Sequence, residues 1–258
     1  AEKDPSDLGG TGFPDQWSQP GGYFCFVDLA FAERKGKRGR AMTEFQEKLA
    51  ELFSAYEIPA GEKQLAALER YAELLCEWNE KMNLTAIVDP EGIRVKHFLD
   101  SALALRYLQI SGKVIDVGTG AGFPGIVWGI LRPELEITLL DSLQKRLTFL
   151  ETVCRELGVN AKLVHARAEE AGRDPALRGK FDCATARAVA GMNVLCEYCM
   201  PFVKTGGIFA ALKGPQMEEE MQKAGRAVKL LGGQVERVES YELPGGDQRR
   251  LAIVRKKG

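Results

Sequence analysis

The sequence predicts an α/β fold in which a mostly parallel sheet ends in an antiparallel hairpin and follows an N-terminal helical extension. Three observations lead to this prediction. A glycine-rich turn at residues 116–125 lies between two apolar runs, strands and helices alternate after it, and the last two strands have no helix between them. Alternation of this kind is typical of parallel sheets, because a parallel crossover needs a helix-length connection.

Length and composition allow such a fold and argue against other classes. The 258 residues, 45% of them hydrophobic, suffice for one α/β domain with an extension or for two small domains. The net charge of −1 gives no global basic signal, so any nucleic-acid binding must rest on local patches. We expect no membrane span, since no apolar run reaches about 18 residues. The six dispersed cysteines fit a reducing cytoplasm.

Residues 1–41 differ from the rest of the chain. They contain several Gly/Pro breaks and a basic cluster at residues 34–40, and their acidic residues argue against a transit peptide. We interpret them as a flexible leader or an artificial addition, with natural translation starting at Met42. The alternative is an arm that contacts RNA through the basic cluster.

Residues 42–111 are predicted to form an N-terminal helical subdomain. Apolar residues recur there at helical spacing, in one helix from Thr43, a longer second helix and a third over roughly His97–Leu108. These apolar residues are Phe45, Leu49, Leu52, Phe53, Leu65, Leu68, Tyr71, Ala72, Leu75, Trp78, Phe98, Leu99, Ala102, Leu103 and Leu105. The pair Ser111-Gly112 then interrupts the pattern.

Residues 112–258 are predicted to form the sheet domain. The expected strands are Val114–Val117, Ile137–Leu140, Lys162–Val164, Phe181–Thr185, Ile208–Leu212, Val235–Leu243 and Arg250–Val254. The expected helices are Gly125–Leu131, Leu143–Leu157, Met192–Pro201 and Gln216–Leu231. The turn signal Pro244-Gly245-Gly246-Asp247 joins the last two strands, which predicts an antiparallel hairpin. Rossmann-like methyltransferases close their sheet in this way, whereas nicotinamide-binding domains do not.

The glycine-rich turn predicts a nucleotide-type ligand, because missing Cβ atoms let a ligand approach the backbone. Gly120, Gly122 and Gly125 satisfy the dinucleotide pattern G-x-G-x-x-G. Asp116 with the closely spaced Gly118, Gly120 and Gly122 also fits the S-adenosylmethionine loop of Rossmann-like methyltransferases. The turn alone does not decide between them.

Polar residues at later strand ends extend the predicted site. Asp141 ends the second strand, 21 residues after Gly120, where a carboxylate can accept hydrogen bonds from both ribose hydroxyls of an adenosine. Asp141-Ser142 also has the composition of a helix N-cap, and both roles are compatible. Ala168-Glu169 would lie beside an adenine, although Glu169 is equally explained as a solvated loop charge.

Two further strand ends point toward the substrate. Arg187 follows the fourth strand, where the group that receives the transfer lies in this architecture, and its planar fork suits a phosphate or a base. Lys213 ends the fifth strand and could meet the same nucleic-acid backbone. The polar segments Trp78–Ile87 and Lys96–Ser101 suggest a second wall of the cleft, although capping and turn formation also explain Asn83 and Thr85.

Cys196 and Cys199 form a C-x-x-C pair that invites a zinc or redox interpretation. No second pair exists, and both histidines lie far away in the sequence. We therefore predict buried structural cysteines on an apolar helix, and no metal site.

Taken together, these motifs resemble the RsmG (GidB) family of methyltransferases. The resemblance covers about residues 42–256 in unbroken order. The segments that carry it are Asn79 with Asn83-Leu84-Thr85, His97–Ser101, Asp116–Gly125, Asp141-Ser142-Leu143 with Lys145-Arg146, Arg167-Ala168-Glu169, Thr185–Val189 and Ala211–Gly214. The resemblance implies methylation of N7 of one guanine in 16S ribosomal RNA with S-adenosylmethionine as cofactor.

The resemblance also implies roles for particular residues. Cofactor contacts are expected at Gly118, Phe123, Asp141, Ser142, Leu143, Ala168, Glu169 and Arg187, together with Asp116 and Gly120 of the turn. The residues expected to serve catalysis or to hold the substrate are Arg187, Lys213, His97 and Asp100. The expected partner is 16S ribosomal RNA or an assembly intermediate of the small subunit, bound by a monomer. The basic residues expected to contact its backbone are Arg187, Lys213, Arg249, Arg250, Arg255, Lys256 and Lys257. Two alternatives stay open, a nicotinamide-dependent oxidoreductase and a non-catalytic RNA-binding protein.

Overall fold

The structure is a computed structural model that describes residues 41–187 and 189–257, so the predicted leader lies almost entirely outside the described residues. The strands are β1 (Lys113–Val117), β2 (Glu136–Asp141), β3 (Ala161–His165), β4 (Phe181–Arg187), β5 (Val203–Lys213), β6 (Gly233–Glu242) and β7 (Gln248–Lys256). Within the described residues they form one sheet of order β3-β2-β1-β4-β5-β7-β6, in which β7 is antiparallel to both neighbours and the other pairs are parallel. The predicted fold class and the closing hairpin are confirmed.

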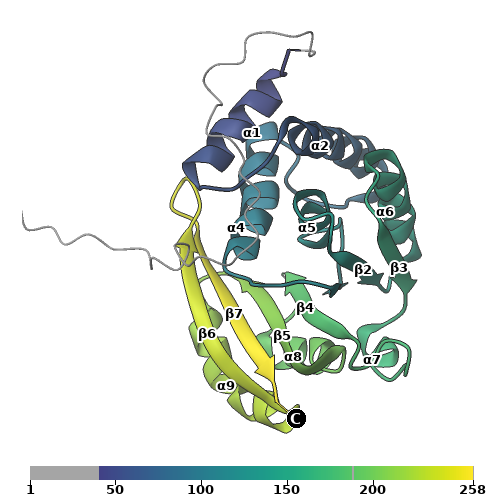
Figure 1. Cartoon of the computed structure of the whole chain (residues 1–258), viewed down its shortest axis with the longest axis vertical. Helices are drawn as coiled ribbons and strands as arrows, with labels where there is room; N and C mark the ends of the chain where they lie inside the picture. Colours follow the sequence, from purple (N-terminus) through teal and green to yellow (C-terminus); the bar gives the residue numbers. More distant parts are fainter. Residues whose placement is uncertain (1–40, 188, 258) are drawn as a thin grey trace, which may run out of the picture. The chain divides into compact units, whose positions relative to one another are not determined.

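Helices cover both faces of this sheet (Figure 1). In chain order they are α1 (Glu44–Ala55), α2 (Glu62–Met82), α3 (Pro90–Gly92), the π-helix η1 (Ile93–Leu99), α4 (Asp100–Arg106), α5 (Gly125–Leu131), α6 (Gln144–Leu157), α7 (Ala168–Ala171), α8 (Met192–Cys199) and α9 (Met217–Leu230). The helices α1, α2, α4, α5 and α6 lie over one face, and α7, α8 and α9 lie over the other (Figure 1).

The sheet divides the buried side chains into two cores because successive strand residues point to opposite faces. Val114 of β1 belongs to the core beneath the N-terminal helices, and its neighbour Ile115 belongs to the core beneath α8 and α9. Both are fully buried, as expected for a parallel strand covered on each side. Cys196 and Cys199 lie buried in the second core, which confirms the predicted burial, and burial raises the pKa of the Cys196 thiol to about 12.

The predicted helical subdomain and sheet domain share the first core. Leu65 and Tyr71 of α2 pack in the same buried cluster as Leu139 of β2. Buried Trp128 of α5 donates its indole N–H to the carbonyl of Ser101, at 2.8 Å. Residues 42–258 accordingly group into one compact unit.

The third predicted helix begins earlier than its apolar pattern. Helix α3 starts after Asp89, whose side chain accepts a hydrogen bond from the Gly92 amide, and Pro90 occupies the first helical position. The chain continues through η1 into α4, which ends at Arg106 and not at Leu108. The extra residue per turn in a π-helix shifts the helical face, so regular spacing did not predict this start. No described helix is long and apolar enough to cross a membrane.

The turn after β1 depends on the absence of a side chain at Gly122. Its φ is +97°, and a Cβ there would lie 2.5 Å from the Tyr71 hydroxyl and 2.8 Å from Leu150. We expect Gly122→Ala to lower the free energy of unfolding by about 3 kcal/mol, from left-handed strain and overpacking together. Urea unfolding measures the loss.

The matched control is Gly158→Ala. Gly158 also has a positive φ, +67°, but nothing lies within 4 Å of the added Cβ. Gly158→Ala should therefore lower the free energy of unfolding only by the conformational cost of a left-handed alanine, about 1–2 kcal/mol. Equal losses in the two variants would contradict the packing argument.

Candidate functional site

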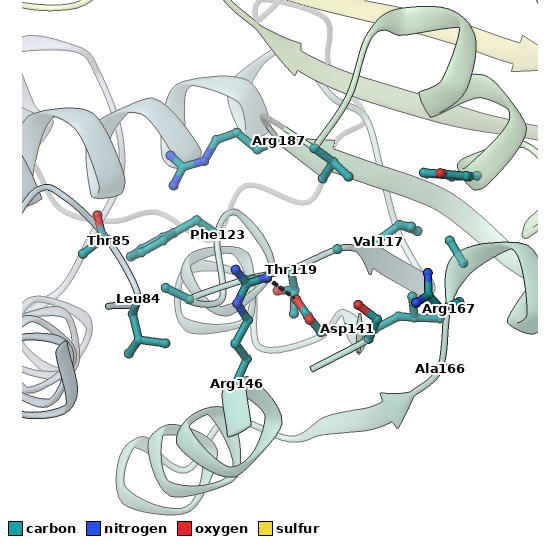
Figure 2. A pocket seen from close by; sticks show the side chains of 18 of the residues that line it. Leu84, Thr85, Val117, Thr119, Phe123, Asp141, Arg146, Ala166, Arg167 and Arg187 are labelled. Atoms are coloured by element: carbon teal, nitrogen blue, oxygen red, sulfur yellow. Dashed lines mark hydrogen bonds and ion pairs between the residues drawn. The ribbon is translucent and has the colours of Figure 1, made fainter. Parts of the chain in front are cut away.

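A cleft of about 480 Å³ lies at the carboxyl ends of the central strands (Figure 2). Strand β1 is flanked there by β2 on one side and β4 on the other, so the crossover connections diverge and leave a crevice. Its lining comprises Leu84, Thr85, His97, Val117, Gly118, Thr119, Gly120, Ala121, Phe123, Leu140, Asp141, Ser142, Arg146, Ala166, Arg167, Ala168, Glu169, Arg187, Val189 and Tyr198. Two segments of the N-terminal part, Leu84-Thr85 and His97, form the second wall that the sequence suggested.

Asp116 shapes the glycine-rich turn from beneath and does not line the cleft. One of its carboxylate oxygens accepts hydrogen bonds from the Thr119 hydroxyl, at 2.8 Å, and from the Gly125 amide, at 2.9 Å. These bonds draw the start of α5 against the end of β1. The other oxygen has no partner among the described residues. Burial raises the pKa of Asp116 to about 6, although the two hydrogen bonds oppose this rise.

Asp141 joins the turn to the start of α6. Its carboxylate accepts the Gly120 amide and the Leu143 amide, each at 2.9 Å, and forms an ion pair with Arg146 at 3.3 Å. The side chain is 1% exposed but lines the cleft. A carboxylate offers about four acceptor positions, so capacity for further donors remains. Both roles weighed from the sequence, helix start and ligand acceptor, are compatible with this geometry.

An aromatic and cationic cluster forms the other half of the cleft (Figure 2). The His97 ring stacks on Phe123, with centroids 4.4 Å apart and planes inclined by 12°. The Arg187 guanidinium lies over the same Phe123 ring, at 4.9 Å. Arg187 therefore makes a cation–π contact with Phe123 at the edge of the cleft.

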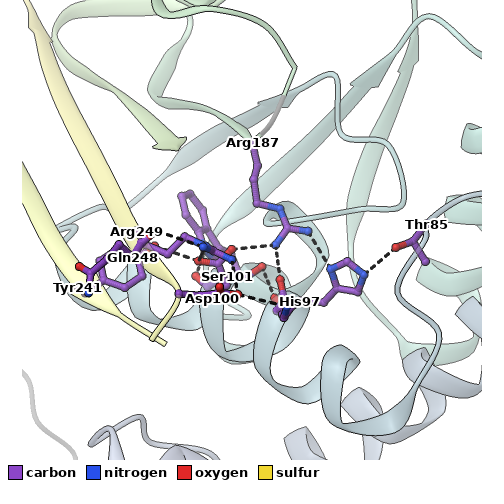
Figure 3. A network of polar contacts seen from close by, with 11 residues as sticks. Thr85, His97, Asp100, Ser101, Arg187, Tyr241, Gln248 and Arg249 are labelled. Carbon is purple, nitrogen blue, oxygen red and sulfur yellow. Dashed lines mark hydrogen bonds and ion pairs between the residues drawn. The ribbon is translucent and has the colours of Figure 1, made fainter. Parts of the chain in front are cut away.

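Hydrogen bonds fix Arg187 and His97 in place (Figure 3). Arg187 donates to the Lys96 carbonyl at 3.1 Å, to Asp100 at 3.3 Å and to His97 Nδ1 at 3.2 Å. Asp100 lies behind Arg187 and is nearly buried, so it acts on the cleft only through this pair. Burial, together with the Arg187 charge, lowers the pKa of His97 to about 3. His97 is therefore neutral at physiological pH.

Most of the residues predicted for the site meet in the cleft. His97, Gly118, Gly120, Phe123, Asp141, Ser142, Ala168, Glu169 and Arg187 all line it. Leu143 donates its backbone amide to Asp141, and the residue is 41% exposed.

Lys213 does not line the cleft. Its ammonium donates to the Ala190 carbonyl at 2.7 Å and pairs with Glu220 at 2.8 Å. It therefore holds the segment between β4 and α8 in place. Its position at a strand end was visible in the sequence, but the acceptors that compete for it come from segments distant in the chain.

Sequence reasoning missed Tyr198 and Tyr241, and it named Arg249 only as a contact to the RNA backbone and not as a partner of Asp100. Tyr198 of α8 lines the cleft from the opposite core. Tyr241 and Arg249, from the two strands of the closing hairpin, bind Asp100 at 3.2 and 3.4 Å. No local pattern marks these residues, because a contact across 141 residues depends on the sheet order.

The sheet order, the antiparallel β7 and the cleft at the β1/β4 crossover define a Rossmann-like methyltransferase fold. The family model described as rRNA small subunit methyltransferase G matches residues 64–251. The chain belongs to this family, GidB.

Curated relatives cover most of the chain. A ribosomal RNA small subunit methyltransferase G from Alkaliphilus oremlandii is 48% identical over 217 residues, 83% of this chain and 91% of that protein. Its counterpart from Symbiobacterium thermophilum is 46% identical over 223 residues, with the same two coverages. A solved precorrin-6y C5,15-methyltransferase from Geobacter metallireducens is 17% identical, covers 61% of this chain and 87% of that chain, and has a TM-score of 0.46, which is too distant to inform function.

The raised pKa of Asp116 predicts a measurable pH dependence of stability. Asp116 ionises with a pKa of about 6 in the folded chain against 3.8 for an unperturbed aspartate. Its protonated form thus favours folding below pH 4, and this contribution, about 3 kcal/mol, is lost as the pH rises through 6. We expect Asp116→Asn to gain stability relative to the natural chain by this order of magnitude between pH 4 and pH 7. Urea unfolding across that range tests it, and parallel curves for the two proteins would refute it.

Proposed function

We propose that this protein transfers a methyl group from S-adenosylmethionine to N7 of a guanine in 16S ribosomal RNA. The observation that carries the proposal is that the glycine-rich turn, Asp141 and Arg187 line one cleft in a chain of the GidB family. The family assignment disfavours the two alternatives, a nicotinamide-dependent oxidoreductase and a non-catalytic RNA-binding protein.

The cleft residues fit the proposed cofactor. Gly118 and Gly120 have positive φ values of +69° and +62° and present bare backbone to the cleft. Asp141 would accept the ribose hydroxyls with its remaining acceptor positions. Ala168 and Glu169 begin α7 beyond β3 and would border the adenine. Bound there, S-adenosylmethionine would supply an electrophilic methyl group on a sulfonium.

The proposed reaction needs positioning and no proton acceptor. Guanine N7 carries a lone pair and no proton. S-adenosylmethionine held at Gly118, Gly120 and Asp141 would supply the methyl group to N7, and its sulfur would keep the electron pair of the broken carbon–sulfur bond. The residues of the cleft would enhance the rate by holding N7 in line with the methyl group. Phe123, His97 and Arg187 would form the wall that orients the base. His97 would act as a positioning residue, because hydrogen bonds from Arg187 and to Thr85 engage both ring nitrogens.

For the partner, we propose 16S ribosomal RNA, alone or within an assembly intermediate, bound in the cytoplasm by a monomer. The basic residues that would contact the RNA backbone include Lys257 and three arginines. Within the protein these arginines already pair with carboxylates, Arg249 with Asp100, Arg250 with Glu218 and Arg255 with Glu236. Lys256, also expected from the sequence to contact RNA, donates to the carbonyls of Met200 and Val203, at 2.9 and 2.8 Å. Its ammonium is thus engaged within the protein.

The test is a radiolabelled methyl-transfer assay on small-subunit RNA, naked and with ribosomal proteins, followed by mapping of the modified base. Label at N7 of one guanine is the expected result. Label on another atom, or none on any RNA form with active protein, would refute the proposal.

Replacing one carboxylate oxygen at Asp141 tests the cofactor assignment. We expect Asp141→Asn to weaken S-adenosylmethionine binding by about 10- to 100-fold, because a hydrogen bond to a charged group contributes roughly 1.5–3 kcal/mol. Calorimetry on the folded variant measures it. The control is Glu151→Gln, the same chemical change on an exposed residue of α6. Equal affinities in both variants would contradict the ribose assignment.

The rate of transfer at saturating RNA should vary little between pH 6 and pH 9. N7 loses no proton, arginine does not titrate in this range, and the pKa of His97 is about 3. Single-turnover measurements across this range provide the test. A steep rise with an apparent pKa near 7 would reveal a general base and contradict the mechanism.

A further inference from the structure

The hydrogen bonds around His97 have a direction that can be derived from Arg187. A guanidinium has donors and no acceptor, so His97 Nδ1 accepts the bond from Arg187 at 3.2 Å. In a neutral imidazole the other nitrogen then carries the proton. His97 Nε2 therefore donates to the Thr85 hydroxyl oxygen, at 3.0 Å.

Thr85 is the end of this chain of donors (Figure 3). Its hydroxyl oxygen also accepts the Ile87 amide at 3.0 Å, so both of its acceptor positions are used. The hydroxyl hydrogen finds no acceptor among the described residues. The Thr85 amide donates to the Asn79 side chain at 2.9 Å, which holds the segment in place. The Thr85 hydroxyl can therefore take part in a further hydrogen bond only as the donor.

This donor faces the half of the cleft where the base would lie. Thr85 lines the cleft beside Phe123, on the side opposite the strand ends that carry Asp141 (Figure 2). The lowered pKa of His97 keeps the imidazole neutral at physiological pH, so the direction of the hydrogen bonds from Arg187 through His97 to Thr85 does not change.

Guanine and adenine differ at the atom beside N7. Guanine presents the acceptor O6 there, whereas adenine presents the donor N6–H₂. We propose that the Thr85 hydroxyl donates a hydrogen bond to O6 of the target guanine and so selects guanine over purines that lack this acceptor. The inference rests on the proposed function, because it assumes that N7 of a purine is presented to the cofactor. In an adenine at the same position, the N6 amino group would face the Thr85 hydroxyl hydrogen. Both groups are donors, so neither would have an acceptor.

The test compares two RNA substrates that differ only at the target base, guanine or 2-aminopurine. The analogue keeps N7 and the 2-amino group and lacks O6. For each protein, kcat/KM is measured on both RNAs and their ratio is taken. We expect Thr85→Val to lower the guanine/2-aminopurine ratio about tenfold, the factor given by a hydrogen bond of ordinary strength.

The ratio separates recognition from a structural role. Loss of the bonds to His97 and Ile87 would lower kcat/KM on both RNAs alike and leave the ratio unchanged. Thr85→Ser, which keeps the hydroxyl, should retain the natural ratio. Thr148→Val makes the same change on an exposed helical residue and should also retain it.

Each outcome decides between the two proposals. A lowered ratio in Thr85→Val that serine restores supports the O6 contact. An unchanged ratio, with the natural chain active on guanine, overturns the contact and leaves the proposed function intact. If the natural chain transfers no methyl group to N7 of guanine, the proposed function fails and the contact with it.

Discussion

The side chain of Arg187 is only 15% exposed, and much of the cleft is arranged to compensate its charge. Asp100 supplies the opposite charge and also binds Arg249 and Tyr241. The pair therefore joins β4, the start of α4 and the closing hairpin. Buried ion pairs add little net stability, but removal of one partner is costly because it strands the other charge. The Arg187–Asp100 pair thus fixes the positions of β4, α4 and the closing hairpin relative to one another, and it adds little to the stability of the fold.

The same charge determines what His97 does. Protonation of His97 would place a second cation within hydrogen-bond distance of Arg187, and burial adds to that penalty. The imidazole consequently stays neutral, accepts from the guanidinium and passes a donor on to Thr85. A histidine in a cleft ordinarily suggests proton transfer. Here the hydrogen bonds to Arg187 and Thr85 fix which nitrogen of His97 carries the proton, so the residue positions its neighbours and transfers no proton. This agrees with a reaction at an atom that has no proton to remove.

The sequence predicts the sheet well because its information is local. Buried parallel strands appear as apolar runs, and Asp116, the glycines and Asp141 lie at the ends of strands that must meet at one edge of the sheet. The start of the third helix was not predicted, because a π-helix breaks the regular spacing. The contacts of Tyr241 and Arg249 with Asp100 were not predicted, because they exist only once the hairpin pairs beside β5. Lys213 was placed correctly at a strand end, but its ammonium binds Glu220 and the Ala190 carbonyl and does not face the cleft.

The two halves of the cleft have different structural origins, which bears on specificity. The glycines and Asp141 belong to strand ends that any sheet of this order brings together, and they line the half of the cleft proposed to hold the cofactor. Thr85 and His97 come from the segment between α2 and α4, outside the sheet, and Phe123 is the shared wall. The proposed selection of the base would therefore depend on the N-terminal helices, which Arg187 and Asp100 join to the sheet. A change of target is then expected to require changes in residues 83–100 more than in the sheet.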